Sequence, residues 1–271
     1  MAEEVPEVVE LEVAGKKNYM SDKPLILVTN DDSISAKGIA ALVSAIEDLG
    51  DIVIVAPDQP QSGMGHAITI NHPLRLKRSD VFSNHEAYTC SGTPVDCVKL
   101  AIYEVLKKRP TLLVSGINHG SNAATNVLYS GTMSAAVEGA IENIPSIGFS
   151  LLNHAPDADF SHSIEYVRNI TQQALEHGMA SHTCLNVNIP AENIQGVKVC
   201  RQGVAFWADS FDKRQDPFGR DYFWLTGSFE ESDNAHDTDL HALSEGYISI
   251  VPTQFDMTAH TCLGDINKWK L

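Results

Sequence analysis

Short aliphatic runs alternate with segments of helical periodicity along most of the chain, and this alternation constrains the fold more than any other feature. An aliphatic run between turn residues predicts a buried strand, whereas apolar residues three and four positions apart predict a helix. Because helices connect parallel strands and cover the sheet, the pattern predicts an α/β fold of three layers around a mostly parallel sheet. The predicted strands are 25–28, 51–56, 67–70, 112–114 and 147–151, and the predicted helices are 39–49, 93–106, 133–141 and 164–175.

The rhythm changes beyond Pro190, where short strands are predicted with no helical pattern between them. The sequence therefore predicts an α/β core over 23–190 and a strand-rich C-terminal region over 191–271. Residues 1–22 are acidic and lack a sustained apolar pattern, which is typical of a mobile extension, and a translation start at Met20 is a hypothesis for this segment. The predicted C-terminal strands are 197–199, 222–224 and 247–250.

Composition excludes several classes of partner. The chain carries 35 acidic and 19 basic residues, a formal net charge of −16. Such a surface repels nucleic-acid backbones and anionic membranes, so neither a nucleic-acid duplex nor a membrane is an expected partner. No apolar run reaches the length of a membrane span, and the first residues lack the pattern of a signal peptide. The five cysteines show no CxxC spacing, which predicts free thiols in a reducing compartment and a cytoplasmic protein.

Two adjacent carboxylates, Asp31 and Asp32, stand where the first predicted strand ends, in the stretch NDDSISAKGI. Neighbouring carboxylates repel each other and raise the pKa of one of them unless a cation neutralises the pair. Open α/β sheets bind their ligands at the carboxyl ends of the strands, which is the place this pair occupies. The alternative is an Asp-Asp turn that caps the following helix.

Three further loops follow apolar strands and bring complementary side chains to the same edge. Ser62 and Asn118 add neutral oxygens to the carboxylates, and hard oxygen ligands of this kind suit magnesium, manganese or calcium. Ser130-Gly131-Thr132 opens a predicted helix, whose unpaired N–H groups and hydroxyls suit a phosphate. Taken singly, each residue has an ordinary alternative, because Ser62 fits a turn, Asn118 and Asn122 fit a loop, and Ser130 or Thr132 fits a helix cap.

Other catalytic motifs are absent from the sequence. There is no GxxxxGK[ST] phosphate loop, no GxGxxG fingerprint, no HExxH helix and no GxSxG elbow. The missing dinucleotide fingerprint disfavours an NAD-dependent dehydrogenase, and the missing elbow disfavours a serine hydrolase.

The chain resembles the SurE survival-protein family over almost everything after residue 22. The stretches that carry the resemblance, in chain order, are NDDSISAKGI, VAPDQPQSG, SGTPVDCV, VSGINHGSN, YSGTMSAAVEG, EGYISIVP and DMTAH. The resemblance implies a Rossmann-like core and a metal-dependent phosphatase acting on nucleoside 5′- and 3′-monophosphates. Some members of the family also degrade short polyphosphate. It further implies an oligomer built through an exchanged C-terminal arm that ends in a helix.

Carried over motif by motif, the resemblance implies Asp31, Asp32, Ser62 and Asn118 as metal ligands, the set already reached from donor chemistry. It implies magnesium or manganese as the metal, and it places Asn122 and Ser130-Gly131-Thr132 on the phosphate side. Whether Asp31 or Asp32 acts as base or nucleophile stays open. Ser33 departs from the family pattern, because many members have Gly at this position. The backbone of this loop can therefore differ from that of those members. His119 occupies a variable position from which nothing is inferred.

The DMTAH stretch places Asp256 and His260 four residues apart, where a helix would bring the two side chains together. The resemblance favours a role in organising the site through the exchanged arm, and the alternative is an exposed ion pair at a helix start. The stretch 206–224 is rich in aromatic residues, which are enriched at interface cores. A homodimer or homotetramer is therefore expected.

Together these features predict a divalent-metal-dependent phosphomonoesterase acting on nucleotides. The alternative from another class is a regulatory module that binds a metal–nucleotide complex without turnover, because the acidic pair and the phosphate loop would look alike in both.

Overall fold

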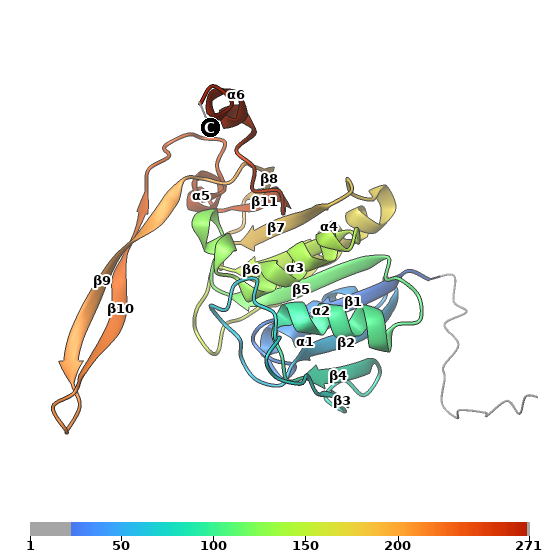
Figure 1. Ribbon diagram of the computed structural model, residues 1–271. Coiled ribbons are helices and arrows are strands. Elements are labelled where there is room, and N and C mark those ends of the chain that lie inside the picture. The colour runs from blue at the N-terminus through green and yellow to red at the C-terminus, as the bar shows by residue number, and fades with distance from the viewer. Residues whose placement is uncertain (1–22, 270–271) are drawn as a thin grey trace, which may run out of the picture.

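The computed structural model of the 271-residue chain describes residues 23–269. The predictions for 1–22, a mobile extension and a start at Met20, lie outside the described residues. Within these residues, nine strands form the central sheet in the order β3-β4-β2-β1-β5-β6-β7-β11-β8 (Figure 1). Their bounds are β1 Leu25–Thr29, β2 Asp51–Pro57, β3 Leu76–Arg78, β4 Glu86–Cys90, β5 Leu112–His119, β6 Ser146–Leu151, β7 Thr183–Ile189, β8 Gly196–Val199 and β11 Tyr247–Gln254.

The central sheet is mostly parallel, as the sequence predicts. Six of its strands pair in parallel from β4 through β7, while β3 pairs antiparallel with β4 and β11 pairs antiparallel with β7. The carboxyl ends of β1, β2, β5 and β6 therefore meet at one edge of the sheet. The loops that leave this edge carry the candidate site.

Helices cover both faces of the sheet, and this confirms the three-layer α/β class. Ile26 and Val28 of β1 pack with α1 and α4 on one face, whereas Leu25 and Leu27 pack with α2 and α3 on the other. This division follows from the strand period of two, which sends successive side chains to opposite faces. The helices are α1 Lys37–Ile46, α2 Pro94–Leu100 continued by the π-helical turn η1 Ala101–Val105, α3 Gly131–Ile141, α4 Ile164–His177, α5 Asp239–Ser244 and α6 Leu263–Ile266.

Two sequence predictions about local structure are wrong. Residues 67–70 form no strand, because side chains at the start of α2 bind the polar backbone groups of this segment. Thr93 Oγ1 donates to the Ala67 carbonyl over 2.7 Å, and the Thr69 N–H donates to Asp96 Oδ1 over 3.1 Å. The C-terminal region also contains the short helix α5, which the hydroxyl of Thr238 caps by accepting the His241 N–H.

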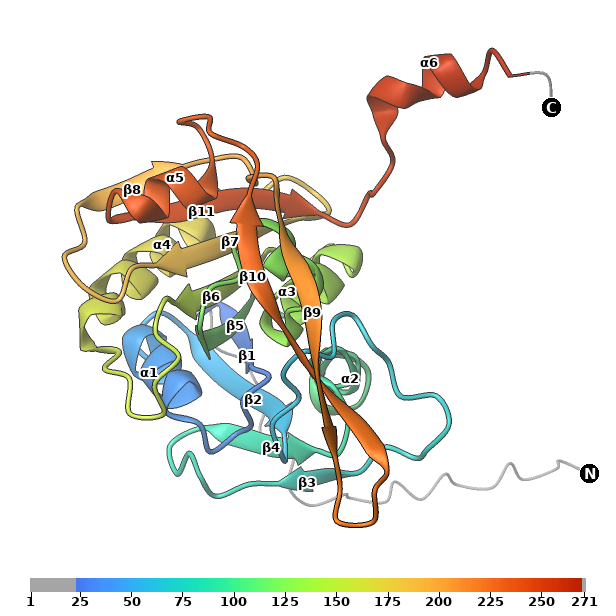
Figure 2. The ribbon, with the colours of Figure 1, turned by 90° about the vertical axis from the view of Figure 1, so that its left-hand side faces the viewer.

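The C-terminal residues extend the central sheet and also leave it. β8 and β11 complete the sheet beyond β7, whereas β9 Ala205–Gln215 and β10 Asp221–Glu231 pair as a separate hairpin that projects from the body (Figures 1 and 2). The terminal segment with α6 also extends away from the body (Figure 2). Aromatic side chains such as Phe211, Phe218 and Trp224 are exposed on the hairpin. An oligomerisation role for 191–271 stays a prediction.

Candidate metal and phosphate site

The acidic pair lies at the carboxyl end of β1. Asp31 is 3% exposed, and its burial, together with the neighbouring charge of Asp32, raises its pKa to about 6. Burial also raises the pKa of Asp32, against the opposing influence of the nearby His119 and of a hydrogen bond from Ser62. Both carboxyl groups therefore resist ionisation in the bare protein, and a cation placed between them would relieve this resistance.

The N-terminus of α3 meets Asp31 directly. Ser130 caps this helix by accepting the Met133 N–H over 3.0 Å, so its hydroxyl has the structural partner that the capping alternative predicts. A Cβ added to Gly131 would lie 2.6 Å from Cβ of Asp31, so glycine permits the close approach of the helix to the acidic pair. Thr132 Oγ1 donates to Asp31 Oδ1 over 2.5 Å. The first turn of α3 thus lies against the acidic pair and fixes one of its carboxylates.

The loop after β2 brings Ser62 to the same place. The Gln61 N–H donates to the Asp31 carbonyl over 2.7 Å, and the Ser62 hydroxyl forms a hydrogen bond with Asp32. Further along this loop, the Gly65 N–H donates to the Tyr129 carbonyl over 3.2 Å. Ser62 therefore lies beside the acidic pair.

A buried carboxylate anchors the far end of this loop to α3. Glu138 accepts hydrogen bonds from His66 Nε2 at 2.9 Å and from Lys99 Nζ of α2. Burial alone would raise the pKa of Glu138, but the hydrogen bonds from His66 and Lys99 outweigh it and lower the pKa. This charged contact holds the loop that carries Ser62 against the body. The sequence analysis missed it, because 72 residues separate His66 from Glu138.

Asn118 lies near the C-terminal end of β5, beside the residue that contacts Asp32. The pairing of β5 with β6 shifts register between Ser115 and Asn118, and such irregularities redirect side chains next to functional sites. Asn118 Nδ2 donates to the Gly120 carbonyl over 2.9 Å, which leaves its side-chain oxygen available to a ligand. The backbone N–H of His119 bonds to Asp32, so this strand end adjoins the acidic pair.

Asn122 holds its loop to the sheet. Its side-chain amide donates to Ser150 Oγ over 2.8 Å, and its backbone N–H donates to Asn188 Oδ1 over 2.7 Å. Its carbonyl accepts the amide of Asn186 over 2.8 Å. These buried contacts support the loop-holding alternative for Asn122, and contact with substrate stays a prediction.

Asp256 and His260 lie elsewhere in the protomer. The two side chains pair at 2.8 Å, as predicted, but the segment between them is not helical, because the Thr258 N–H bonds to Asp256 in a turn. This turn and His260 lower the pKa of Asp256 to about 2. Since β11 runs antiparallel to β7 and Gln254 pairs with Thr183, the pair follows the strand end at the opposite edge of the sheet. No hydrogen bond or ion pair within 23–269 joins it to the acidic pair.

Two residues that the sequence analysis did not select adjoin the site. His119 lies close enough to Asp32 to lower the carboxylate pKa, and its ring contacts Phe160 edge-on at 5.1 Å. The buried Asn30 donates its amide to the Ser33 carbonyl over 2.8 Å and supports the turn after β1. The sequence signal that could have identified them is their position in the chain, because His119 follows Asn118 and Asn30 precedes Asp31. Ser33 itself has a positive φ of 86°, the backbone that glycine adopts freely.

The residues present fit a hard divalent cation. Asp32 Oδ2 is buried and has no hydrogen-bond partner, so this carboxylate oxygen is available to a cation. Within 23–269 no cluster of three or more His, Cys, Asp or Glu side chains is placed to hold a metal. The donors here are two carboxylates with a hydroxyl and an amide oxygen, which suit magnesium, manganese or calcium better than a soft transition metal.

The fold and the site define a class: an α/β protein that presents an acidic pair and a helix N-terminus at one edge of a parallel sheet. The family described as "Survival protein SurE" matches residues 26–209, and the chain belongs to this family. The resemblance drawn from the sequence motifs is thereby confirmed.

Relatives match over nearly their full length. A protein of Flavobacterium johnsoniae named 5′-nucleotidase SurE is 58% identical over 254 residues, which cover 92% of this chain and 98% of the relative. A protein of Cytophaga hutchinsonii with the same name is 55% identical over 253 residues and covers the same shares. The crystal structure of the SurE protein from Aquifex aeolicus superimposes with a TM-score of 0.78 at 36% identity, and the match covers 90% of this chain and 98% of that one.

Proposed function

We propose that this chain is a nucleotidase, a divalent-metal-dependent phosphomonoesterase that hydrolyses nucleoside monophosphates to nucleoside and phosphate. The observation that carries the proposal is the contact between Gly131 and Asp31, which puts the N-terminus of α3 against the acidic pair. Curated relatives at 58% and 55% identity are named 5′-nucleotidase SurE, which supports the substrate class. Hydrolysis of 3′-monophosphates and of short polyphosphate belongs to the same proposal.

The site residues divide into two groups. Asp31, Asp32, Ser62 and Asn118 would hold the cation, magnesium or manganese in this proposal, because their oxygens are hard ligands. The bound cation supplies positive charge that polarises the phosphoryl group and offsets the charge of the transition state. The N-terminus of α3 at Gly131 would bind the phosphate, because the helix dipole favours an anion at this end.

Proton transfer falls to the acidic pair. A carboxylate would accept the proton of the attacking water, or would attack phosphorus itself, while the bond from phosphorus to the nucleoside oxygen breaks and the nucleoside leaves. Asp31 and Asp32 are both candidates for either role. Thr132 restricts Asp31 to one orientation through its hydrogen bond, while Asp32 keeps one buried oxygen without a protein partner.

The cellular location and the oligomeric state of the chain are also part of the proposal. None of the helices in 23–269 combines the length and apolar character needed to cross a bilayer. All five cysteines are unpaired, and three of them are buried, which agrees with the predicted free thiols. A cytoplasmic setting and a homodimer or homotetramer assembled through 191–271 are part of the proposal.

Phosphate release from a panel of nucleotides tests the function. The purified chain is stripped with EDTA and assayed on 5′- and 3′-nucleoside monophosphates and tripolyphosphate, with and without added magnesium or manganese. Phosphate release that requires metal supports the proposal, and Asp32→Asn serves as the inactive control. Binding of nucleotides without any release under all conditions would favour the regulatory module instead.

A further inference from the structure

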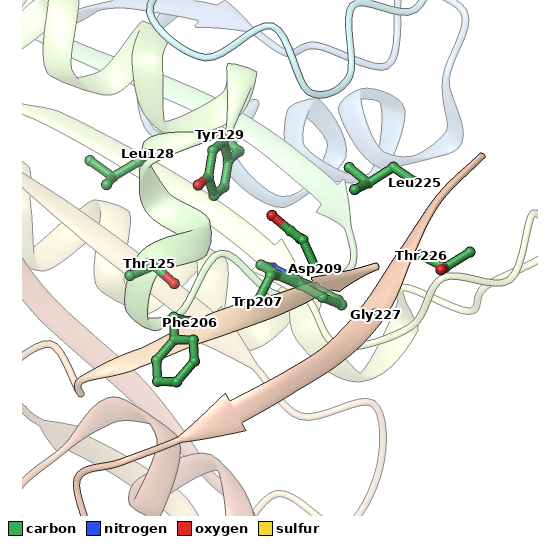
Figure 3. Close-up of a pocket in the computed structure, with 9 residues that line it drawn as sticks. All are labelled: Thr125, Leu128, Tyr129, Phe206, Trp207, Asp209, Leu225, Thr226 and Gly227. Atoms are coloured by element: carbon green, nitrogen blue, oxygen red, sulfur yellow. The ribbon is translucent and has the colours of Figure 1, made fainter. Parts of the chain in front are cut away.

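A groove of about 530 Å³ lies between the base of the hairpin and the 3₁₀ helix η2 Ala124–Leu128 (Figure 3). This volume falls within the usual range for small-molecule pockets, roughly 300–1,000 Å³. Tyr129, directly after η2, contributes one wall, and Trp207 and Asp209 of β9 contribute another. In Figure 3 Phe206 points away from Tyr129.

Hydrogen bonds fix the hairpin base to η2, so both walls are held in place. Thr125 Oγ1 donates to the Ala205 carbonyl over 2.7 Å, and the Trp207 indole N–H donates to Asn126 Oδ1 over 2.8 Å. On the neighbouring strand, the ring of Phe229 packs against Trp207 with centroids 5.3 Å apart. The indole is therefore positioned before any ligand arrives.

The groove begins where the phosphate-binding end of α3 begins. Tyr129 directly precedes Ser130, and the next residue, Gly131, lies against Asp31. Because consecutive Cα atoms lie about 3.8 Å apart, the Cα atom of Tyr129 lies within about 8 Å of the Cα atom of Gly131. A phosphate ester bound at the helix N-terminus can thus extend its organic group into the groove.

The side chains of the groove match the chemistry of a nucleobase. Tyr129 is 59% exposed and Trp207 is 45% exposed, so aromatic faces are available for stacking. Asp209 lies two residues beyond Trp207 on the same face of β9, and no hydrogen bond or ion pair within the described residues occupies its carboxylate. A carboxylate can accept hydrogen bonds from the N–H groups that bases carry on their edges.

We propose that this groove is the nucleobase subsite: the base stacks on Trp207 and Tyr129, and one of its N–H groups donates to Asp209. The inference rests on the proposed nucleotidase function and deepens it, because it names the residues that recognise the nucleoside. A segment of a second copy of this chain is the competing occupant, and the test distinguishes the two.

The test compares 5′-AMP with ribose 5-phosphate, which keeps the sugar and the phosphate but lacks the base. For Trp207→Ala we expect kcat/KM for 5′-AMP to fall about tenfold, within the range that base–aromatic stacking provides, and kcat/KM for ribose 5-phosphate to stay within twofold. Asp209→Ala should lower the 5′-AMP value several-fold with the same selectivity. Trp224→Ala is the matched control, because it removes an indole from the same hairpin outside the groove, and the ratio of the two substrates should not change.

An equal loss on both substrates in Trp207→Ala, accompanied by a lowered oligomeric mass in light scattering, would overturn the proposal in favour of the second copy. Wild-type kcat/KM on both substrates in Trp207→Ala would overturn it outright. Calorimetric binding of the two compounds to wild type and Trp207→Ala decides the question even if neither is hydrolysed. In that event the nucleotidase function fails, while a Trp207-dependent preference for 5′-AMP in binding would still support the subsite.

Discussion

The hydroxyl of Thr132 lies 2.5 Å from Oδ1 of Asp31 and donates a hydrogen bond to it, which joins the first turn of α3 to the end of β1. These two residues are 101 positions apart in the chain, so the contact exists because the parallel sheet brings both loops to one edge. The hydrogen bond also lowers the pKa of Asp31 against the effect of burial. Thr132 therefore orients a carboxylate that the proposed metal site needs.

Removal of this hydroxyl should impair turnover. Thr132→Val keeps the approximate shape and deletes the donor, and hydrogen bonds to charged groups contribute about 1.5–3 kcal/mol, so we expect kcat/KM to fall about tenfold or more. Thr132→Ser retains the hydroxyl and should stay close to wild type. Steady-state kinetics on 5′-AMP at saturating metal would measure both variants, and full activity in Thr132→Val would remove this hydrogen bond from the mechanism.

The acidic pair should cost stability when no cation is bound. Because the pKa of Asp31 is about 6 in the folded protein and 3.8 as its ordinary value, the folded state binds the proton more tightly than the unfolded state. The stability of the metal-free protein should therefore fall as pH rises from about 4 to about 6 and remain low above that, by about 3 kcal/mol from this group.

Asp31→Asn tests this sign directly. In EDTA at pH 8 the variant should have a higher free energy of unfolding in urea than wild type, and the advantage should vanish near pH 4, where the wild-type carboxyl is protonated. Added magnesium should stabilise wild type and leave the variant unchanged, since a ligand that binds the folded state stabilises it. A variant that is less stable than wild type at pH 8 would show that contacts within the protein already offset the cost of burying the charged Asp31 carboxylate.

The central sheet, and the position of the site loops at one edge of it, could be predicted from the sequence for clear physical reasons. Aliphatic runs of strand length between turn residues have few other stable structures, and the carboxyl ends of parallel strands share one edge. Asp31, Asp32, Ser62 and Asn118 could therefore be placed together before any coordinates. The helix start at Thr93-Pro94 was equally clear, and the structure shows a capping box there.

The missed features depend on contacts between residues distant in sequence. β7 reads TCLNVNI, in which Asn186 and Asn188 interrupt the aliphatic pattern, and their buried amides find partners in the loop around Asn122, more than 60 residues away. The position of His260 depends on β11 running antiparallel, which no local pattern indicates. The hydrogen bond between His66 and Glu138 likewise cannot be predicted from the local sequence pattern.

Ser33 should be replaceable by glycine with a gain in stability. Its φ of 86° lies in the left-handed region, which costs a residue with a side chain on the order of 1 kcal/mol or more. Ser33→Gly should raise the free energy of unfolding by roughly 0.5–1 kcal/mol after the larger entropy of the unfolded glycine is taken into account. Ser33→Ala keeps the strained backbone and serves as the control. Equal stability of the two variants would show that the turn is not strained.

His260 should act only through a second copy of the chain. It pairs with Asp256 on an exposed segment that leaves the opposite edge of the sheet from the acidic pair. We therefore expect His260→Ala to weaken the oligomer and lower phosphatase activity together, as measured by light scattering and kinetics over a range of protein concentrations. Wild type should be at least a dimer at micromolar concentration, and a monomer would refute this. Loss of activity with an intact oligomer and unchanged metal affinity would make His260 a catalytic residue.

The central claim is that Asp31 and Asp32 hold the divalent cation on which nucleotide hydrolysis depends. Titration of manganese into the EDTA-stripped protein, followed as phosphate release from 5′-AMP, tests it most directly in wild type and Asp32→Asn. Wild type should show no release without metal and saturable activation with it, while Asp32→Asn, which loses a charge at the same size, should stay lower by orders of magnitude at every concentration. Full turnover in EDTA, or equal activation of both proteins, would contradict the claim.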